Sequence, residues 1–194
     1  MEEPYLLFHL CLSIIDFSVF ELIMSGIFAY NEPVVHAYMI KAEREVTDKD
    51  ETLAFLQRNK ILRVAFHTKS APYIVPLCYG FNYDGTRLIF YFHGATKGRK
   101  LELAKENPFV GFEIDTHIET KISEQACGFS LLYESMIGTG HLYIIEDAAE
   151  KVHCLNRIMF QFTGKEQWEY REESLKKTIA FSLLVDHFTM KQNL

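Results

Sequence analysis

Hydrophobic and polar positions alternate with short periods from about residue 39 to the end of the chain. A period of two, or a short apolar run bounded by turn residues, predicts a strand, whereas a spacing of three to four predicts a helix. By these criteria the predicted strands are 61–66, 72–83, 86–93, 109–115, 135–147 and 179–191. The predicted helices are 47–59, a short segment ending at Asn107, 148–163 and a turn or helix at 173–178.

Capping residues set the expected ends of these helices. Thr47 is the candidate N-cap of the first helix, with Asp50 completing a near capping box. Asp147 is expected to cap the long helix, and Gly164 to end it. Pro108 should end the short helix, since proline disfavours helical geometry in the residue before it.

Turn residues indicate how the strands are arranged. Asp84-Gly85 predicts a hairpin, Pro76 suggests that the 72–83 strand lies at an edge or carries a bulge, and Gly138 and Gly140 mark a bend. Short turns between β-rich runs favour antiparallel pairing. We therefore expect a mainly β (α+β) fold, with aromatic residues on both faces that suggest a closed barrel or a sheet whose outer face meets a partner.

Composition narrows the function classes. The net charge of −6, without a long basic run, argues against nucleic-acid binding, because phosphate contacts need a basic face. The four cysteines form no CxxC pair and the histidines no ligand spacing, so neither a metal site nor a disulfide framework is expected, and a cytoplasmic location fits. Cys127 is interpreted as a buried structural cysteine.

The N-terminal residues 1–38 form an atypical apolar extension ahead of the domain expected over 39–194. The stretch Tyr5 to Tyr30 is long enough to span a membrane, but Asp16 and Glu21 lie within it at high cost in hydrocarbon. A buried or poorly ordered extension is therefore preferred to a membrane anchor. Met39 is also a plausible second start.

The stretch FHGATKGRK contains an unusual concentration of positive charge. Lys97, Arg99 and Lys100 stand at the start of a predicted helix, where the helix dipole is already positive. An anion held there by the backbone N–H groups and these side chains would remove the repulsion, and Gly94 and Gly98 allow close approach. A phosphate monoester is the predicted guest, with Thr96 and His93 as further donors.

The sequence of this turn allows two other interpretations. It could be a solvated basic turn whose cations point into water. It also approaches the phosphate-binding loop of nucleoside triphosphatases, but the glycine spacing is one residue short and Leu101 replaces the magnesium-binding hydroxyl. A nucleoside triphosphatase is therefore not expected.

The segments PYIVPL, YDGTRLIFYFHGATKGRKLEL, NPFVGFEID, LLYESMIGTGHLYIIED and EKVHCLNRIMFQFTG resemble the flavin-binding split-barrel proteins. The resemblance is to the branch with nitroimidazole-resistance reductases, related to pyridoxamine-phosphate oxidase, and covers about Arg44 to Lys191. It implies a six-stranded antiparallel split β-barrel with flanking helices, a homodimer, and FMN in each of two clefts at the subunit interface.

By this resemblance Arg99 and Lys100 hold the FMN phosphate, and the rest of the turn lines the same site. The cofactor-binding residues so expected are Val75, Pro76, Leu77, His93, Ala95, Thr96, Lys97, Gly98, Arg99, Lys100, Tyr133 and Ser135. The backbone of the first three would meet the polar edge of the isoalloxazine ring, and Tyr133 and Ser135 would reach the flavin from one subunit or the other. The interface cleft would be lined by Tyr73, Tyr79 and Tyr133.

The implied activity is that of an FMN-dependent oxidoreductase, which passes electrons from NAD(P)H to a small electron-poor acceptor such as a nitroaromatic or a quinone. No arginine follows in the C-terminal FTMKQNL, so a role in vitamin B6 oxidation is not expected. The alternatives are a non-catalytic flavin- or haem-binding module, with His93 as a candidate haem ligand, and an interaction protein that has lost its cofactor.

Overall fold

A computed structural model describes residues 41–194. The strands are β1 (Ile61–Phe66), β2 (Tyr73–Cys78), β3 (Gly80–Tyr83), β4 (Leu88–Ala95), β5 (Phe109–Lys121), β6 (Ser130–Ile145) and β7 (Thr178–Asn193). The helices are η1 (Ala42–Arg44), α2 (Lys49–Arg58), α3 (Arg99–Glu106), η2 (Ala126–Gly128), α4 (Ala148–Thr163) and α5 (Glu172–Lys176). The apolar segment 1–38 and the membrane question attached to it lie outside the described residues.

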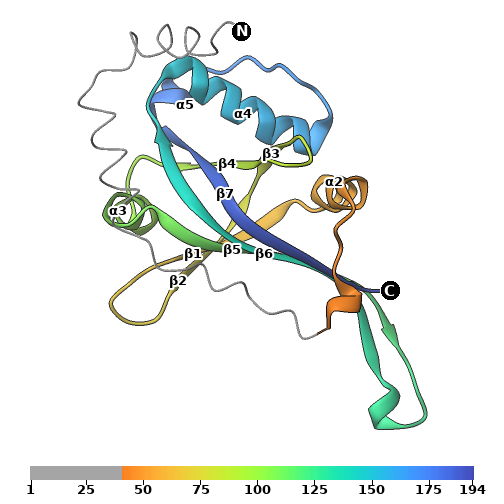
Figure 1. Cartoon of the computed structure of the whole chain (residues 1–194). Coiled ribbons are helices and arrows are strands. Elements are labelled where there is room, and N and C mark those ends of the chain that lie inside the picture. The colour runs from red at the N-terminus through yellow and green to blue at the C-terminus, as the bar shows by residue number, and fades with distance from the viewer. Residues whose placement is uncertain (1–40) are drawn as a thin grey trace, which may run out of the picture. The chain divides into compact units, whose positions relative to one another are not determined.

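All seven strands form one antiparallel sheet in the order β2-β1-β5-β6-β7-β4-β3, with helices packed around it (Figure 1). The mainly β fold with flanking helices is therefore confirmed. The strand number differs from the six expected, because the run 72–83 is two strands rather than one. Its two halves, β2 and β3, lie at opposite edges of the sheet.

The run 72–83 divides at Tyr79, which connects β2 at one edge of the sheet to β3 at the other edge. Consecutive Cα atoms are 3.8 Å apart, so Cys78 and Gly80 lie within about 7.6 Å of each other although they belong to opposite edges. The sheet must therefore curl until its edges converge here. Hydrogen-bonded pairing between β2 and β3 is absent from the described ladders, so the curl does not close into a barrel.

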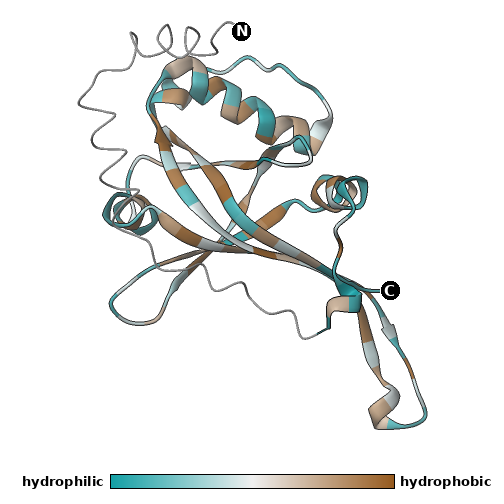
Figure 2. Ribbon diagram, viewed as in Figure 1, coloured by the Kyte–Doolittle hydropathy of each residue, from teal (hydrophilic) through white to brown (hydrophobic). Residues whose placement is uncertain are grey.

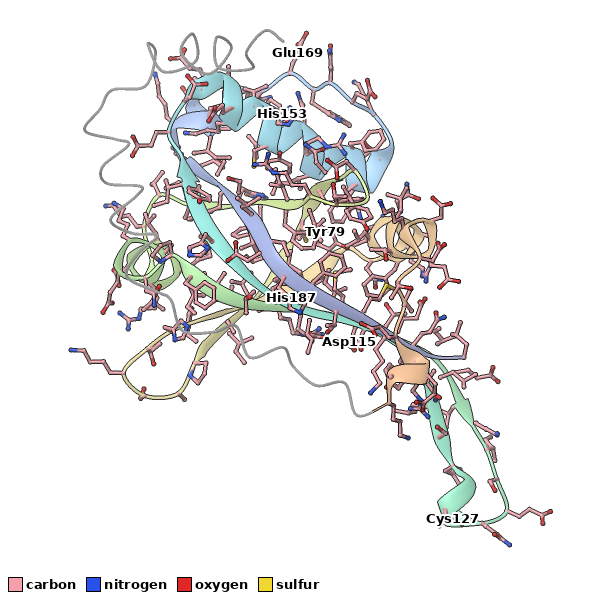
Figure 3. The ribbon with its side chains drawn as sticks, in the orientation of Figure 1. Tyr79, Asp115, Cys127, His153, Glu169 and His187 are labelled. Carbon is pink, nitrogen blue, oxygen red and sulfur yellow. The ribbon has the colours of Figure 1, made fainter. Side chains whose placement is uncertain are left out.

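Burial explains why the chain crosses over at Tyr79. Its side chain is fully buried, and its hydroxyl donates a hydrogen bond of 2.9 Å to the carbonyl oxygen of Leu56 at the end of α2 (Figure 3). Gln161 of α4 donates to the same oxygen at 2.7 Å. One carbonyl thus connects the strand junction to two helices. The prediction that Tyr79 lines a surface cleft is wrong.

The core fills the inside of the curl. It is built largely from aromatic side chains, with Phe90, Phe92 and Phe181 fully buried on β4 and β7. A second apolar cluster lies under α4 around Cys154. In Figure 2 apolar and polar segments alternate along α2 and α4, as expected for helices with one buried face.

The helix ends follow the sequence signals with one shift. Asp147 caps α4 by accepting from the N–H groups of Ala149 and Glu150, as predicted. Gly164 ends α4 with a left-handed φ of 70°, also as predicted. The cap of α2 is Asp48 rather than Thr47, because the carboxylate of Asp48 accepts two backbone N–H bonds.

Strands β5 and β6 extend beyond the predicted 109–115 and 135–147 and pair with each other as far as Lys121 and Ser130. They form a hairpin that projects from the rest of the sheet, with η2 at its tip (Figure 1). Cys127 lies at that tip and is exposed, so its interpretation as a buried cysteine is wrong (Figure 3). The predicted bend is confirmed as a register shift between Thr139 and Gly140.

The three described cysteines, Cys78, Cys127 and Cys154, are free thiols. Within residues 41–194, no helix combines the length and hydrophobicity that a membrane span requires.

Helix α4 sits directly on β3 at Gly80. A Cβ atom built on Gly80 would lie 2.3 Å from the carbonyl carbon of Arg157 in the α4 backbone. A backbone cannot yield as a flexible side chain does, so the substitution must push the helix off the sheet. Gly111 of β5 offers a matched control, because its Cβ would meet its nearest neighbour at 3.8 Å.

Gly80→Ala is expected to lower the free energy of unfolding by about 3 kcal/mol, at the upper end of overpacking costs. Gly111→Ala should change it by less than about 0.5 kcal/mol. Urea denaturation of both variants measures the difference. Equal stability of the two variants would contradict the close packing of α4 on β3.

Candidate functional site

Helix α3 begins without a side-chain cap. Its N-cap is Gly98, with φ 127° and ψ 167°, and no side chain accepts from its first N–H groups. Helices α2 and α4, in contrast, each place an aspartate carboxylate on theirs. The positive φ favours glycine, and the space beside its Cα is open to 4 Å. The start of α3 therefore presents free backbone donors to an accessible position.

Lys100 does not point into water. Its ammonium donates a 3.1 Å hydrogen bond to the carbonyl oxygen of His93 and lies 5.4 Å from the ring centre of Phe181. A Cβ on Gly94 would come within 2.7 Å of the lysine Nζ, so a larger residue there would displace the end of the lysine side chain from this position. Burial lowers the pKa of Lys100, which means that its surroundings disfavour the charged form.

His93 stands at the end of β4 beside this lysine. Its pKa is lowered first by partial burial and then by the charge of Lys100. Both causes favour the neutral imidazole, which has one ring nitrogen as donor and one as acceptor.

Arg99 is the first residue of α3 and lines a groove. Its side chain is 53% exposed, and its ion pair with Glu102 is long, at 3.6 Å, and contributes little. It lines a groove of about 550 Å³ together with Glu106 and the loop of residues 68–73 between β1 and β2. Thr96 and Lys97 are exposed in the preceding turn. Lys100 is therefore not a solvated cation, because it contacts His93 and Phe181. Arg99 borders the groove.

The β1–β2 loop is the part of this groove that the sequence patterns did not reveal. Thr68 hydrogen-bonds within the loop to the carbonyl oxygen of Ala71 at 2.7 Å, which holds it folded against the groove. The polar run 67–70 marks a loop in the sequence. Its proximity to Arg99, thirty residues away, follows from the pairing of β1 with β5, because Phe66 lies opposite Val110 and α3 ends just before β5.

Strand β2 is a free edge, and its residues divide between two faces. Val75 and Leu77 pack against the core, whereas Pro76 is exposed. Pro76 lies opposite Arg63 of β1 and has no N–H to donate, so this position can offer a ligand at most its carbonyl oxygen. The other side of β2 pairs with no further strand, so the backbone groups that point away from β1 are available at this edge.

Tyr133 and Ser135 lie far from the α3 start within one chain. Ala180 of β7 pairs with His93, while Lys191 of the same strand pairs with Ser135. The eleven-residue separation between Ala180 and Lys191 along β7 corresponds to about 35 Å of strand. A single chain thus brings together the turn 93–100 and the β1–β2 loop, but not Tyr133 and Ser135.

Known proteins are similar to this chain in both sequence and fold. The family model described as pyridoxamine 5'-phosphate oxidase matches residues 48–192. No curated protein matches the chain. A crystal structure of a proposed 5-nitroimidazole antibiotic resistance protein from Bacteroides thetaiotaomicron is 27% identical, with a TM-score of 0.64, over 76% of this chain and 86% of that one.

Two further solved structures share the fold at lower identity. An FAD and haem binding protein from Mycobacterium smegmatis is 19% identical with a TM-score of 0.68, over 77% of this chain and 73% of that one. A flavocytochrome from Azotobacter vinelandii is 19% identical with a TM-score of 0.65, over 78% of this chain and 70% of that one. Because the family model spans most of the chain and the sheet order supports it, the chain belongs to the pyridoxamine 5'-phosphate oxidase family.

Proposed function

We propose that the protein is a cytoplasmic, homodimeric FMN-dependent oxidoreductase that passes electrons from NAD(P)H to a small electron-poor acceptor, such as a nitroaromatic or a quinone. The FMN phosphate occupies the start of α3, between its backbone N–H groups and the side chains of Arg99 and Lys100. Thr96, Lys97 and Gly98 complete this turn, next to His93 and Ala95.

The observation that carries the proposal is the uncapped start of α3. Free N–H groups, a half-buried lysine and an arginine with only a weak partner gather around an open glycine. A phosphate monoester, with two charges and three acceptor oxygens, matches this donor set. It would also offset the burial that lowers the pKa of Lys100, because a nearby negative charge favours the ammonium form.

The remaining residues support a flavin rather than an isolated phosphate. The groove along α3 leads away from Arg99, and the free edge of β2 offers backbone groups around Pro76 for a polar ring edge, with Val75 and Leu77 behind them. Bound flavin supplies two-electron redox chemistry of its own. The chain then has to hold the phosphate, orient the ring and limit access of water.

A second subunit completes the proposed site. Tyr133 and Ser135 stand on the outer face of the sheet, in line with Ile137, which is 50% exposed. Ile61 and Ile74 on β1 and β2 are 49% and 59% exposed. A two-fold partner would cover such apolar residues and bring its own Tyr133 and Ser135 to the α3 end of this chain.

A haem-binding module is the second candidate, and the state of His93 is the observation that favours it. Its neutral imidazole, favoured by burial, is the form that ligates iron. Two of the solved structures with this fold are described as a flavocytochrome and as an FAD and haem binding protein. A visible spectrum separates the candidates, because haem gives one intense sharp band and flavin two broad ones.

The phosphate contact can be isolated by comparing FMN with riboflavin, which lacks the phosphate. The double variant Arg99→Ala with Lys100→Ala should bind FMN at least about 100-fold more weakly, since each charge-assisted hydrogen bond contributes about 1.5–3 kcal/mol. Its affinity for riboflavin should change by less than about threefold. Quenching of flavin fluorescence gives both dissociation constants.

Lys105→Ala provides the matched control, because it removes an exposed lysine from the last turn of the same helix. It should leave both affinities unchanged. An equal loss of FMN and riboflavin binding in the double variant would show that the phosphate lies elsewhere.

The contribution of a partner subunit can be tested by mixing two defective chains. One carries Arg99→Ala with Lys100→Ala, and the other Tyr133→Ala. If the groups come from different subunits, each mixed dimer regains one intact site, so unfolding and refolding an equal mixture should restore about a quarter of the wild-type FMN content. If both groups serve the site of their own chain, mixing restores nothing.

Electron transfer is tested on the flavin-loaded protein without oxygen. NADH or NADPH should bleach the visible flavin absorption within seconds to minutes, and a nitroaromatic or quinone should restore it. Protein that retains FMN but is bleached by neither nucleotide, while dithionite reduces it, would instead indicate a non-catalytic carrier.

A further inference from the structure

A second cleft lies away from the α3 groove, between α2, α4 and the β3–β4 hairpin. Its volume is about 390 Å³, within the range of small-molecule sites. None of its lining residues lines the α3 groove. In Figure 1, α2 and the β3–β4 turn lie on one side of the sheet and α3 with the β1–β2 loop on the other.

The cleft combines apolar walls with two arginines. Leu53 of α2, Ile89 of β4 and Phe160 of α4 contribute apolar surface, and Phe81 borders the cleft although it is almost fully buried in the core. Arg87 enters from the start of β4 and Arg157 from α4. Among residues 41–194 neither arginine forms an ion pair, so both guanidinium groups keep their charge available to a ligand in the cleft.

Arg157 is held in a fixed orientation. Its Nε and one terminal nitrogen donate to the carbonyl oxygen of Phe81, at 3.2 and 2.7 Å, and its guanidinium lies 5.0 Å from the ring centre of Phe160. These contacts leave part of the planar donor fork unused. The side chain is thus pre-oriented at the wall of the cleft.

The two guanidinium groups act on a common region. The hydroxyl of Tyr91 accepts a 3.1 Å hydrogen bond from Asn82, and burial raises its pKa. The charges of Arg157 and Arg87 both act weakly against that rise, so both lie within electrostatic reach of this hydroxyl. Two cations that face one region repel each other unless an anion joins them.

The one carboxylate in the cleft wall does not provide that anion. Asp84 uses an oxygen to accept from Thr86 and from the backbone of Arg87, at 2.7 to 2.9 Å. These bonds hold the pKa of Asp84 down to about 2, and it makes no ion pair with the Arg87 side chain within the described chain. Asp84 therefore stays ionised, with Oδ1 bonded into the turn and no ion pair to either arginine among residues 41–194.

We propose that this cleft binds a small aromatic carboxylate, with the carboxylate between Arg87 and Arg157 and the ring against Phe160 and Leu53. Guanidinium forks match the planar geometry of a carboxylate, and the apolar walls match an aromatic ring. The site is independent of the proposed flavin site, and its ligand is either an effector or a second small molecule that the protein carries.

Calorimetric titration with 2-naphthoate tests the site, and 2-naphthamide serves as the neutral probe of the same shape. The carboxylate should bind at least about tenfold more tightly than the amide. Arg87→Gln removes a guanidinium that has no side-chain partner among residues 41–194, so the variant should fold normally and lose at least about tenfold in naphthoate affinity. Arg171→Gln, an exposed arginine elsewhere, should not change it.

Arg157→Lys, which retains the charge but not the planar fork, should also weaken naphthoate binding. Equal affinity for naphthoate and naphthamide, or an unchanged affinity in Arg87→Gln, overturns the proposal. So does inorganic phosphate that binds as tightly as naphthoate, because the apolar walls would then contribute nothing.

Each titration is repeated in the presence of saturating FMN. Unchanged naphthoate binding is the expected result, whereas displacement by FMN would put the ligand in the α3 groove and overturn the proposal. If FMN itself fails to bind, the naphthoate result still stands, so the two proposals fail separately.

Discussion

The crossing at Tyr79 is the constraint on which the rest of the molecule depends. Two strands at opposite edges of a seven-stranded sheet are joined through one buried residue, and this forces the sheet to curl. Strand β1 pairs with β5, with Phe66 opposite Val110, and α3 ends just before β5, so the β1–β2 loop lies beside α3. The groove beside Arg99 therefore depends on this strand pairing, and its residues need no proximity in sequence.

Uncompensated positive charge is the second organising feature. Cations gather without close carboxylate partners at the start of α3 and in the cleft of Arg87 and Arg157, although the chain as a whole is acidic. Ion pairs are few among the described residues, and the bridge from Arg63 to Glu113 and Asp115 at 2.9 and 2.6 Å is one of them. What sets the two cationic places apart is that each borders a cleft, at the start of α3 and beside Arg87 and Arg157, where an anion would reduce the repulsion between like charges.

Short-range signals gave the reliable part of the sequence prediction. Asp147, Gly164 and the Asp84-Gly85 turn act within a few residues of themselves, so their effects could be inferred from local chemistry. The N-cap of α2 is Asp48, one position after the predicted Thr47, because both side chains could supply an oxygen to the first N–H groups. The division of 72–83 could not be foreseen, since Tyr79 is fixed by the carbonyl of Leu56. The direction of Lys100 likewise depends on Phe181, eighty-one residues away.

The carbonyl oxygen of Leu56 has a consequence for how the molecule moves. Because it accepts from both Tyr79 and Gln161, α2 cannot separate from α4 without breaking contacts made by the strand junction as well. The walls of the cleft between those helices are thereby fixed before any ligand arrives. A guest there would meet a shape already formed and lose little affinity to ordering the protein.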